Sequence, residues 1–245
     1  FKMDKFFVRY DVKNALRLSL RDLRGTTLGL KPIVWVGIAL AVFQQFVGIN
    51  VIFYYSTTLW RSVGFAESEA LTTSVITSVT NVLVTVVAIL LVDKVGRRPL
   101  LIAGSVGMAV TLATMAVAFS QAQGTGESAA LPQPWGPIAL VAANLYVVSF
   151  GATWGPIMWV MLGEMFPNKF RATAVSVASA ANWVANFVVS TTFPSLAAVG
   201  LTLAYGLYAL FAVLSLLFVL WQVPETKGRE LEEMTESSGR PARRE

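Results

Sequence analysis

The sequence lacks both cysteine and histidine, and only 13% of its 245 residues are charged. Without cysteine there are no disulfides and no thiolate chemistry, and without histidine there is no imidazole acid–base catalysis. Zinc or haem sites built from these side chains are excluded as well, so we expect no metal and no cofactor. Soluble domains carry about 25% charged residues, so the composition predicts a membrane protein.

Apolar residues are abundant instead, at 55% of the chain. Segments long enough to cross a bilayer lie at about 33–58, 71–92, 99–120, 135–162, 172–193 and 199–222. No Asp, Glu, Lys or Arg lies near the centre of any segment, where each would cost roughly 2.5 to 3.5 kcal/mol on insertion. The sequence therefore predicts an all-α membrane protein with six transmembrane helices.

We divide the chain into a basic cytoplasmic linker (1–30), a transmembrane bundle (31–223) and a cytoplasmic tail (224–245). In the linker, cations at every fourth position beside an apolar stripe indicate an amphipathic helix on the membrane surface. A solvated linker is the alternative, because Gly25 and Gly29 would interrupt a helix. The cations are Lys5, Arg9, Lys13, Arg17 and Arg21. We see no signal peptide, and the start at Phe1 suggests a piece of a longer protein.

The distribution of positive charge predicts the orientation. If the segments cross alternately, all but one of the 19 lysines and arginines lie on one side, and the exception is Arg61. Positive charge is retained in the cytoplasm, so both termini are expected there, in a multi-pass protein of the cell membrane. Topology thus explains the net charge of +5, and no nucleic-acid partner is needed.

The polar content of the segments repeats after the third. The first and fourth are too long for a straight crossing and contain potential breaks, at Gly48 and at Gly155-Pro156. The second and fifth carry polar stripes, whereas the third and sixth are apolar. Three is an odd number of crossings, so the arrangement is a 3+3 inverted repeat, in which paired broken helices point to a transport site. We expect segments one, two, four and five to face a polar interior, and three and six to face lipid.

Uncharged amides recur on the four segments expected to face this interior. Grouped inside a membrane, they suit a ligand that is polar but neutral, such as a sugar. The alternative is that they only make hydrogen bonds between helices. Two tryptophans add aromatic faces suited to the C–H surface of a sugar ring. The candidate lining comprises Gln44, Gln45, Asn50, Asn81, Asn182 and Asn186, with Trp159 and Trp183.

Two cytoplasmic connections combine acids with arginines. They are Asp93–Pro99 and Glu164–Arg171. Bidentate arginine–carboxylate pairs can form in one conformation and separate in another, which suits a gate. The alternative is that the cations only set the topology.

Five motifs resemble the C-terminal half of bacterial sugar porters of the major facilitator superfamily. They occur in the family's order and cover nearly everything after residue 30. The motifs are QQFVGINVIFYYST (Gln44–Thr57), DKVGRRP (Asp93–Pro99), WGPIMWVMLGEMFPNKFR (Trp154–Arg171), NWVANF (Asn182–Phe187) and PETKGR (Pro224–Arg229). The resemblance implies one half of a twelve-helix fold that works by alternating access. The other six helices, with the family's proton-binding carboxylate, would be the partner half.

The resemblance also implies roles for individual residues. Positions matching Gln44, Gln45, Asn50, Asn81, Trp159 and the Asn182–Asn186 turn contact sugar in the family. Tyr54 and Tyr55 match residues of the extracellular gate. The cytoplasmic salt-bridge network of the outward-facing state matches Asp93, Arg97, Arg98, Glu164 and Arg171.

The leading hypothesis is therefore transport of a monosaccharide, a hexose such as glucose, through half of a proton-coupled symporter. The alternatives are a facilitative uniporter, a helix-packing assembly subunit, a homodimer of six-helix halves, or a membrane enzyme acting on lipid-linked substrates. An enzyme is disfavoured, because the only nearby carboxylates, Asp93 and Glu164, each have an arginine close by in the sequence. The expected partners are sugar, protons, the lipid bilayer and the N-terminal half.

Overall fold

The computed structural model describes residues 22–25, 27–62, 65–123 and 130–227, and every regular element in these ranges is a helix. Most of the predicted basic linker and tail therefore lie outside the described residues, including the five linker cations at every fourth position. The helices are α2 (Pro32–Phe46), α3 (Ile49–Tyr54), α4 (Ser56–Ser62), α5 (Glu67–Val95), α6 (Arg97–Ser120), α7 (Trp135–Gly151), α8 (Trp154–Met165), α9 (Arg171–Val199) and α10 (Leu201–Gln222).

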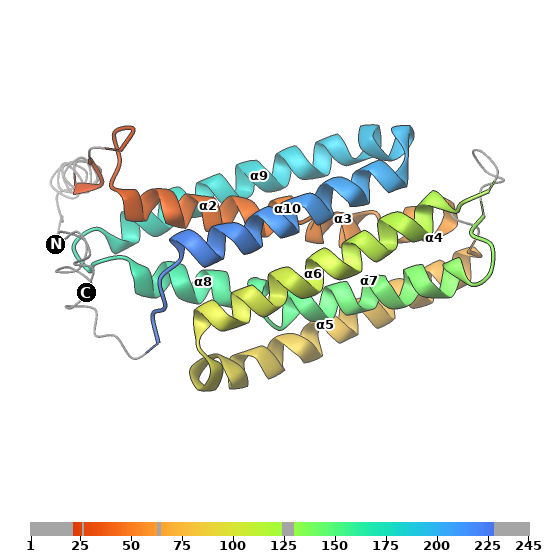
Figure 1. Cartoon of the computed structure of the whole chain (residues 1–245), viewed down its shortest axis with the longest axis horizontal. Helices are drawn as coiled ribbons and strands as arrows, with labels where there is room; N and C mark the ends of the chain where they lie inside the picture. Colours follow the sequence, from red (N-terminus) through yellow and green to blue (C-terminus); the bar gives the residue numbers. More distant parts are fainter. Residues whose placement is uncertain (1–21, 26, 63–64, 124–129, 228–245) are drawn as a thin grey trace, which may run out of the picture.

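These helices form the six expected spans, each long and apolar enough to cross a membrane. Helices α2 and α3 together make span one, and α7 and α8 together make span four (Figure 1). The other spans are the single helices α5, α6, α9 and α10. Their boundaries agree with those predicted from the sequence to within about two helical turns.

Span one is broken at Gly48, as predicted. Gly48 has φ 84° and lies between α2 and α3 in the left-handed conformation that glycine tolerates best. A Cβ there would lie 2.7 Å from the Tyr208 ring, so space as well as conformation favours glycine. The span was expected to continue to residue 58, but it ends at Tyr54. Tyr55 leaves the helical conformation, and its hydroxyl donates to the carbonyl of Ser190 on α9.

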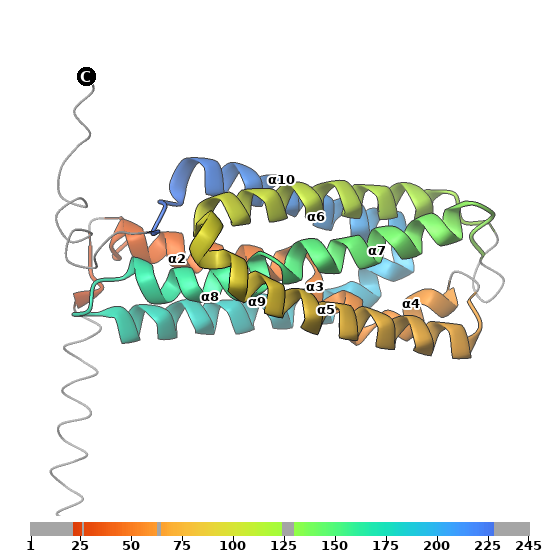
Figure 2. The ribbon, with the colours of Figure 1, turned by 90° about the horizontal axis from the view of Figure 1, so that it is seen from below.

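Span four is also broken, but not at Gly155-Pro156 as expected. The chain leaves the helix at Ala152 and Thr153, and Pro156 lies in the first turn of α8. Proline lacks an N–H and its ring clashes with the carbonyl four residues earlier, here that of Ala152. The disruption therefore falls one turn before the proline, and Figure 2 shows α7 and α8 following each other along one line.

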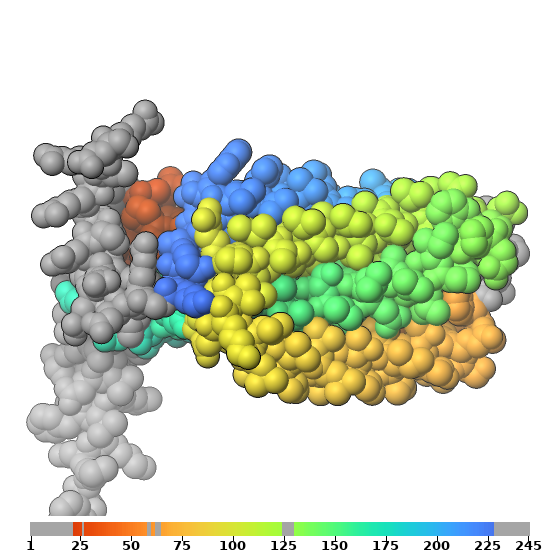
Figure 3. Space-filling model, turned by 60° about the horizontal axis from the view of Figure 1, so that its bottom comes forward, coloured from red at the N-terminus to blue at the C-terminus, as the bar shows by residue number. Residues whose placement is uncertain are grey.

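The spans pack unevenly. On one face α10, α6, α7 and α5 lie side by side, with α6 between α10 and α7 (Figure 3). Helix α2 packs against α9. In the most apolar stretches of α5 and α9, only 11% and 28% of residues are buried, against 50% in α6. The spans with polar stripes are thus the most open ones, and the expectation that spans three and six face lipid stays a prediction.

The described lysines and arginines gather at one end of the bundle, with Arg61 as the exception. This end carries the start of α2, the α5–α6 and α8–α9 connections, and the end of α10 (Figure 1). Lys169 pairs with Asp22 at 3.0 Å, and the Lys31 ammonium lies 4.3 Å from the centre of the Phe170 ring. The connections that carry the cations in the sequence therefore lie together at one end of the folded bundle.

Candidate functional site

A cleft of about 400 Å³ lies between the two broken spans and the polar faces of α5 and α9. None of the described residues that line it is charged. Ile49, Phe53 and Phe150 contribute apolar surface. The structure brings all eight predicted substrate-binding residues into this lining: Gln44, Gln45, Asn50, Asn81, Trp159, Asn182, Trp183 and Asn186.

Three buried amides form the wall of the cleft. Asn182 on α9 donates to the Gln44 side-chain oxygen at 2.8 Å and to the carbonyl of Ala41 at 2.9 Å. Gln45 donates in turn to the Asn182 side-chain oxygen at 3.1 Å. Each of the three amides is at most 7% exposed, and each has a protein partner. A buried amide without a partner would be costly, so these bonds fix the wall in one arrangement.

The break at Gly48 completes this network. On a straight helix, Gln45 and Asn50 would point roughly 140° apart, since each residue turns the helix by about 100°. In the structure the Asn50 amide donates to Gln45 Oε1 at 2.6 Å and to Asn186 Oδ1 at 2.9 Å. The helix break therefore brings together side chains that a continuous helix would keep apart.

The second break supplies backbone acceptors. Gln44 Nε2 donates to the carbonyls of Trp154 and Gly155, at 3.1 and 3.2 Å, in the first turn of α8. The Trp154 indole is fully buried, and its N–H reaches the Leu101 carbonyl at 3.1 Å and Ser105 Oγ at 3.0 Å on α6. The two broken spans are thus joined through one glutamine, and the joint is anchored in a third span.

Other side chains of the cleft lining are accessible. The side chains of Trp159 and Trp183 are 44% and 67% exposed, and Asn50 and Asn81 are partly exposed. Asn81 lies close to Gly151 at the end of α7, where a Cβ would be 2.8 Å from Asn81 Oδ1. The cleft therefore presents aromatic faces and neutral amides on its accessible side, a combination that suits a ring with C–H and hydroxyl groups.

The two adjacent tyrosines differ in position. Tyr54 lines the cleft and is 59% exposed. Tyr55 does not line it, because its ring packs on Phe193 with centroids 5.0 Å apart and its hydroxyl binds the Ser190 carbonyl at 3.0 Å. Of the two predicted gate residues, only Tyr54 has direct access to the cleft.

A charged cluster lies at the cationic end, outside the cleft. Arg97 makes two hydrogen bonds to the Glu164 carboxylate, at 2.7 and 3.0 Å, and one to Asp93 at 3.0 Å. The Arg97 side chain is 12% exposed and that of Glu164 33%, whereas Asp93 is 80% exposed. The bidentate pair ties the start of α6 to the end of α8, and three of the five residues predicted for the network are joined.

Arg98 and Arg171 make no ion pair among the described residues, and their expected place in this network stays a prediction. Arg98 donates instead to the carbonyl of Leu220 at 2.7 Å, near the end of α10. Arg171 donates from Nε to the Phe166 carbonyl at 3.0 Å, and its buried Nη2 has no partner in the described part of the chain. Carbonyls at helix C-termini lack a helical donor and can accept hydrogen bonds from arginine. A search for carboxylates in the sequence therefore does not find the partners of these two arginines.

Sequence reasoning assigned no role to Glu225, although it lies within one of the quoted motifs. Its carboxylate accepts the backbone N–H groups of Arg97 and Arg98, both at 3.1 Å, at the start of α6. Thr226 also donates to Glu164 Oε2 at 2.7 Å. In the sequence, Glu225 is only recognisable as an acid shortly after the last span. Its position does not indicate which helix it would cap.

The environment of Glu225 lowers its pKa. Partial burial acts in the opposite direction, but the backbone N–H groups of Lys227, Arg97, Arg98 and Thr226 stabilise the carboxylate and outweigh it. The segment after α10 is therefore held to the start of α6 by an ionised cap.

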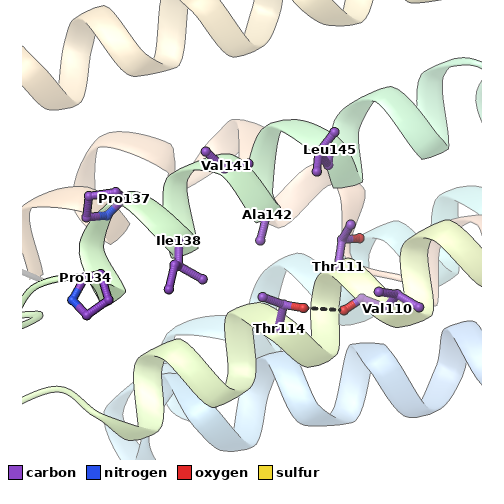
Figure 4. Close-up of a pocket in the computed structure, with 9 residues that line it drawn as sticks. All are labelled: Val110, Thr111, Thr114, Pro134, Pro137, Ile138, Val141, Ala142 and Leu145. Carbon is purple, nitrogen blue, oxygen red and sulfur yellow. Dashed lines mark hydrogen bonds between the residues drawn. The ribbon is translucent and has the colours of Figure 1, made fainter.

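A second cavity, of about 390 Å³, lies between α6 and α7 (Figure 4). Its lining is apolar except for Thr111 and Thr114, whose hydroxyls donate to the carbonyls of Gly107 and Val110 in their own helix. The described lining of this cavity therefore has no free polar side chain to orient a hydrophilic ligand, although the cavity has nearly the same volume as the amide-lined cleft.

Comparison with known proteins agrees with this geometry. The family model described as "Sugar (and other) transporter" matches residues 8–237. The glucose transport protein of Synechocystis is 56% identical over 214 residues, which are 87% of this chain and 46% of that protein. The D-xylose-proton symporter of Escherichia coli is 40% identical over 209 residues, covering 82% of this chain and 40% of that protein. The chain thus spans about half the length of these relatives.

Solved structures of sugar porters also match this chain. The major facilitator proton:xylose symporter XylE, bound to 6-bromo-6-deoxy-D-glucose, matches with a TM-score of 0.74 and 36% identity. The match covers 94% of this chain and 49% of XylE. The similarity therefore extends over nearly the whole of this chain.

Proposed function

Because this chain belongs to the sugar transporter family of the major facilitator superfamily, we propose that it is the C-terminal half of a monosaccharide transporter. Its substrate would be a hexose such as glucose, moved across the membrane by alternating access. The observation that carries the proposal is the uncharged cleft where two broken spans present amides and tryptophans together. The named functions of the relatives, glucose and xylose transport, support the same substrate class.

The proposed binding mode uses hydrogen bonds to sugar hydroxyls and stacking on the tryptophan rings. The partly exposed amides, Asn50 and Asn81, would contact hydroxyls directly, with Gln45 behind Asn50. Net affinity would be modest, because hydroxyls exchange water for amides with little gain. Specificity would be higher, because a missing or inverted hydroxyl leaves a buried amide without a partner.

A companion six-helix half would close the open side of the cleft. Helices α5 and α9 are the least buried spans of the bundle, and the relatives have about twice this chain's length. We place both termini and the charged cluster on the cytoplasmic side, where cations are retained. The Arg97–Glu164 pair would then act in the cytoplasmic gate, and Tyr54 in the extracellular one.

Proton-coupled uptake is the preferred form of transport, and facilitated diffusion is the alternative. No described carboxylate lies near the middle of a span, so the proton-binding group would come from the companion half. The relative named a D-xylose-proton symporter supports coupling. The discriminating measurement is uptake into proteoliposomes of the full-length protein: an imposed proton gradient should concentrate sugar inside, whereas a uniporter would only equilibrate it.

Replacing Gln45 or Asn50 by alanine in the full-length protein tests the site. Each change should weaken binding of labelled glucose or xylose by about tenfold or more, because a hydrogen-bond partner is lost inside the cleft. Asn144→Ala is the matched control. Within the described ranges this amide bonds only to Thr77 and to the Leu140 carbonyl, and it is not among the residues that line the cleft.

The control should alter stability but leave affinity within about twofold. If all three variants bind sugar as the wild type does, the cleft is not the site. The amides would then serve only helix packing.

A further inference from the structure

The break in span one takes the helical hydrogen-bond partner away from the Val47 carbonyl. In a continuous helix the Val47 carbonyl would accept the N–H of Val51, four residues later. In the structure the Val51 N–H donates to the carbonyl of Gly48 instead, at 3.1 Å. Val47 is completely buried, so its carbonyl needs another donor.

Tyr146 supplies that donor. Its hydroxyl lies 2.7 Å from the Val47 carbonyl oxygen, and its side chain is fully buried. Tyr146 belongs to α7, which is the first half of the other broken span. The bond therefore runs from one interrupted span to the break in the other, and it replaces the helical bond that the break removes.

This bond acts next to the residues that depend on the break. Gln45 precedes Val47 by two residues and Asn50 follows it by three, and the two amides are joined at 2.6 Å only because the helix is interrupted between them. If Val47 recovered the Val51 N–H, the helix would straighten and Asn50 would turn away from Gln45.

We propose that Tyr146 is a positioning residue for ligand binding. Its hydroxyl occupies the Val47 carbonyl, which keeps the helix interrupted at Gly48 and keeps Asn50 in the cleft. This inference rests on the proposed function. Tyr146 itself does not line the cleft, so its effect must pass through the backbone of span one.

A neighbouring tyrosine provides a matched control. Tyr205 on α10 is also fully buried, but its hydroxyl has no hydrogen-bond partner within the described residues. Changing either tyrosine to phenylalanine removes one oxygen atom and keeps the ring. Only Tyr146→Phe deprives a backbone carbonyl of its donor, so the two variants separate that bond from the general effect of losing a buried hydroxyl.

The first experiment measures equilibrium binding of glucose and xylose to the full-length protein in detergent. Tyr146→Phe should weaken binding by about tenfold, whereas Tyr205→Phe should stay within about twofold of the wild type. Adding Asn50→Ala to Tyr146→Phe should then cost less than the two separate losses combined, because both act on one contact. Equal affinities for the two phenylalanine variants, or fully additive losses, would overturn the proposal.

Hydrogen exchange gives a second readout that needs no sugar. Amides of Ile49–Tyr54 should exchange faster in Tyr146→Phe than in the wild type or Tyr205→Phe, because the segment loses its fixed orientation. Unchanged exchange there would overturn the inference even if affinity fell. If the wild type binds no monosaccharide, the proposed function fails, while the exchange rates still decide whether Tyr146 holds the break.

Discussion

The molecule contains two polar clusters built on opposite principles. The amide cluster of the cleft is neutral and its hydrogen bonds cross three spans, whereas the Arg97 cluster is ionic and lies at the ends of helices. A buried charge in the membrane is expensive, but amides can be satisfied there by one another. At the helix ends water is close, and the ionic cluster keeps Asp93 80% exposed.

In the proposed transporter, this difference would separate sugar binding from gating. Neutral amides can release and accept a sugar without leaving a charge behind in the membrane. Ion pairs at helix ends can open and close without disturbing the cleft. We therefore expect changes in the cleft to alter affinity, and changes in the ionic cluster to alter the rate of transport.

Introducing a charge into the cleft should have the largest effect. Asn182→Asp replaces an amide that donates to Gln44 and to the Ala41 carbonyl with a carboxylate that donates to neither. We expect sugar affinity to fall by about a hundredfold or more, because the buried charge would face the Gln44 and Ala41 oxygens with no cation beside it among the described residues. Equilibrium binding measures this, with Asn144→Asp as a control for a charge placed elsewhere in a span. If Asn182→Asp and Asn144→Asp lost sugar affinity to a comparable extent, amides of the cleft could not be distinguished from amides that only pack helices.

Neutralising the ionic cluster should have a smaller and different effect. Glu164→Gln removes the bidentate partner of Arg97, and we expect the maximal transport rate to fall by about tenfold. Affinity for sugar should change by less than about threefold. Exchanging both charges, with Arg97→Glu and Glu164→Arg together, should restore part of the rate. A loss of affinity as large as the loss of rate would contradict the separation of tasks.

The cap made by Glu225 should affect stability in a pH-dependent way. Its pKa is lowered in the folded protein, so its stabilisation is present at neutral pH and is lost as the pH falls through that lowered value. Glu225→Gln should lower the melting temperature by about 2 °C at pH 7. The difference from the wild type should shrink on acidification, which thermal melting of both proteins between pH 7 and pH 3 would show. A constant difference would mean that the charge of Glu225 is not what matters.

Asp93→Asn should have the smallest effect. Its pair with Arg97 is short, but an exposed carboxylate gains little from such a contact. Transport rate and affinity should stay within about twofold of the wild type when measured beside Glu164→Gln. If Asp93→Asn and Glu164→Gln had effects of equal size, the exposure of a carboxylate would not determine how much its pair with Arg97 contributes.

The sequence contained enough to predict the bundle and the composition of the cleft. Spans follow from long apolar runs, and the break at Gly48 follows from a local rule about glycine. The amides could be assigned to one cleft because they lie on spans expected to face a polar interior, within or near motifs that resemble those of sugar porters. The second break was predicted one turn too late, because the ring of Pro156 acts on the preceding turn.

Some contacts between distant parts of the chain could not be predicted. Glu225 caps a helix that begins 128 residues earlier, and Tyr146 reaches across 99 residues to Val47. Nothing in either local sequence specifies these partners. Arg98 shows the same limit, since a free carbonyl at the end of α10 binds it where a carboxylate was expected.

The most direct test is a structure of the full-length protein with bound glucose. The sugar should lie in the amide-lined cleft, with hydroxyls within about 3 Å of the Asn50 amide and of at least one other cleft amide, and with its ring against Trp159 or Trp183. A sugar bound elsewhere, with the amides of Gln45, Asn50 and Asn182 still bonded only to one another, would contradict the account.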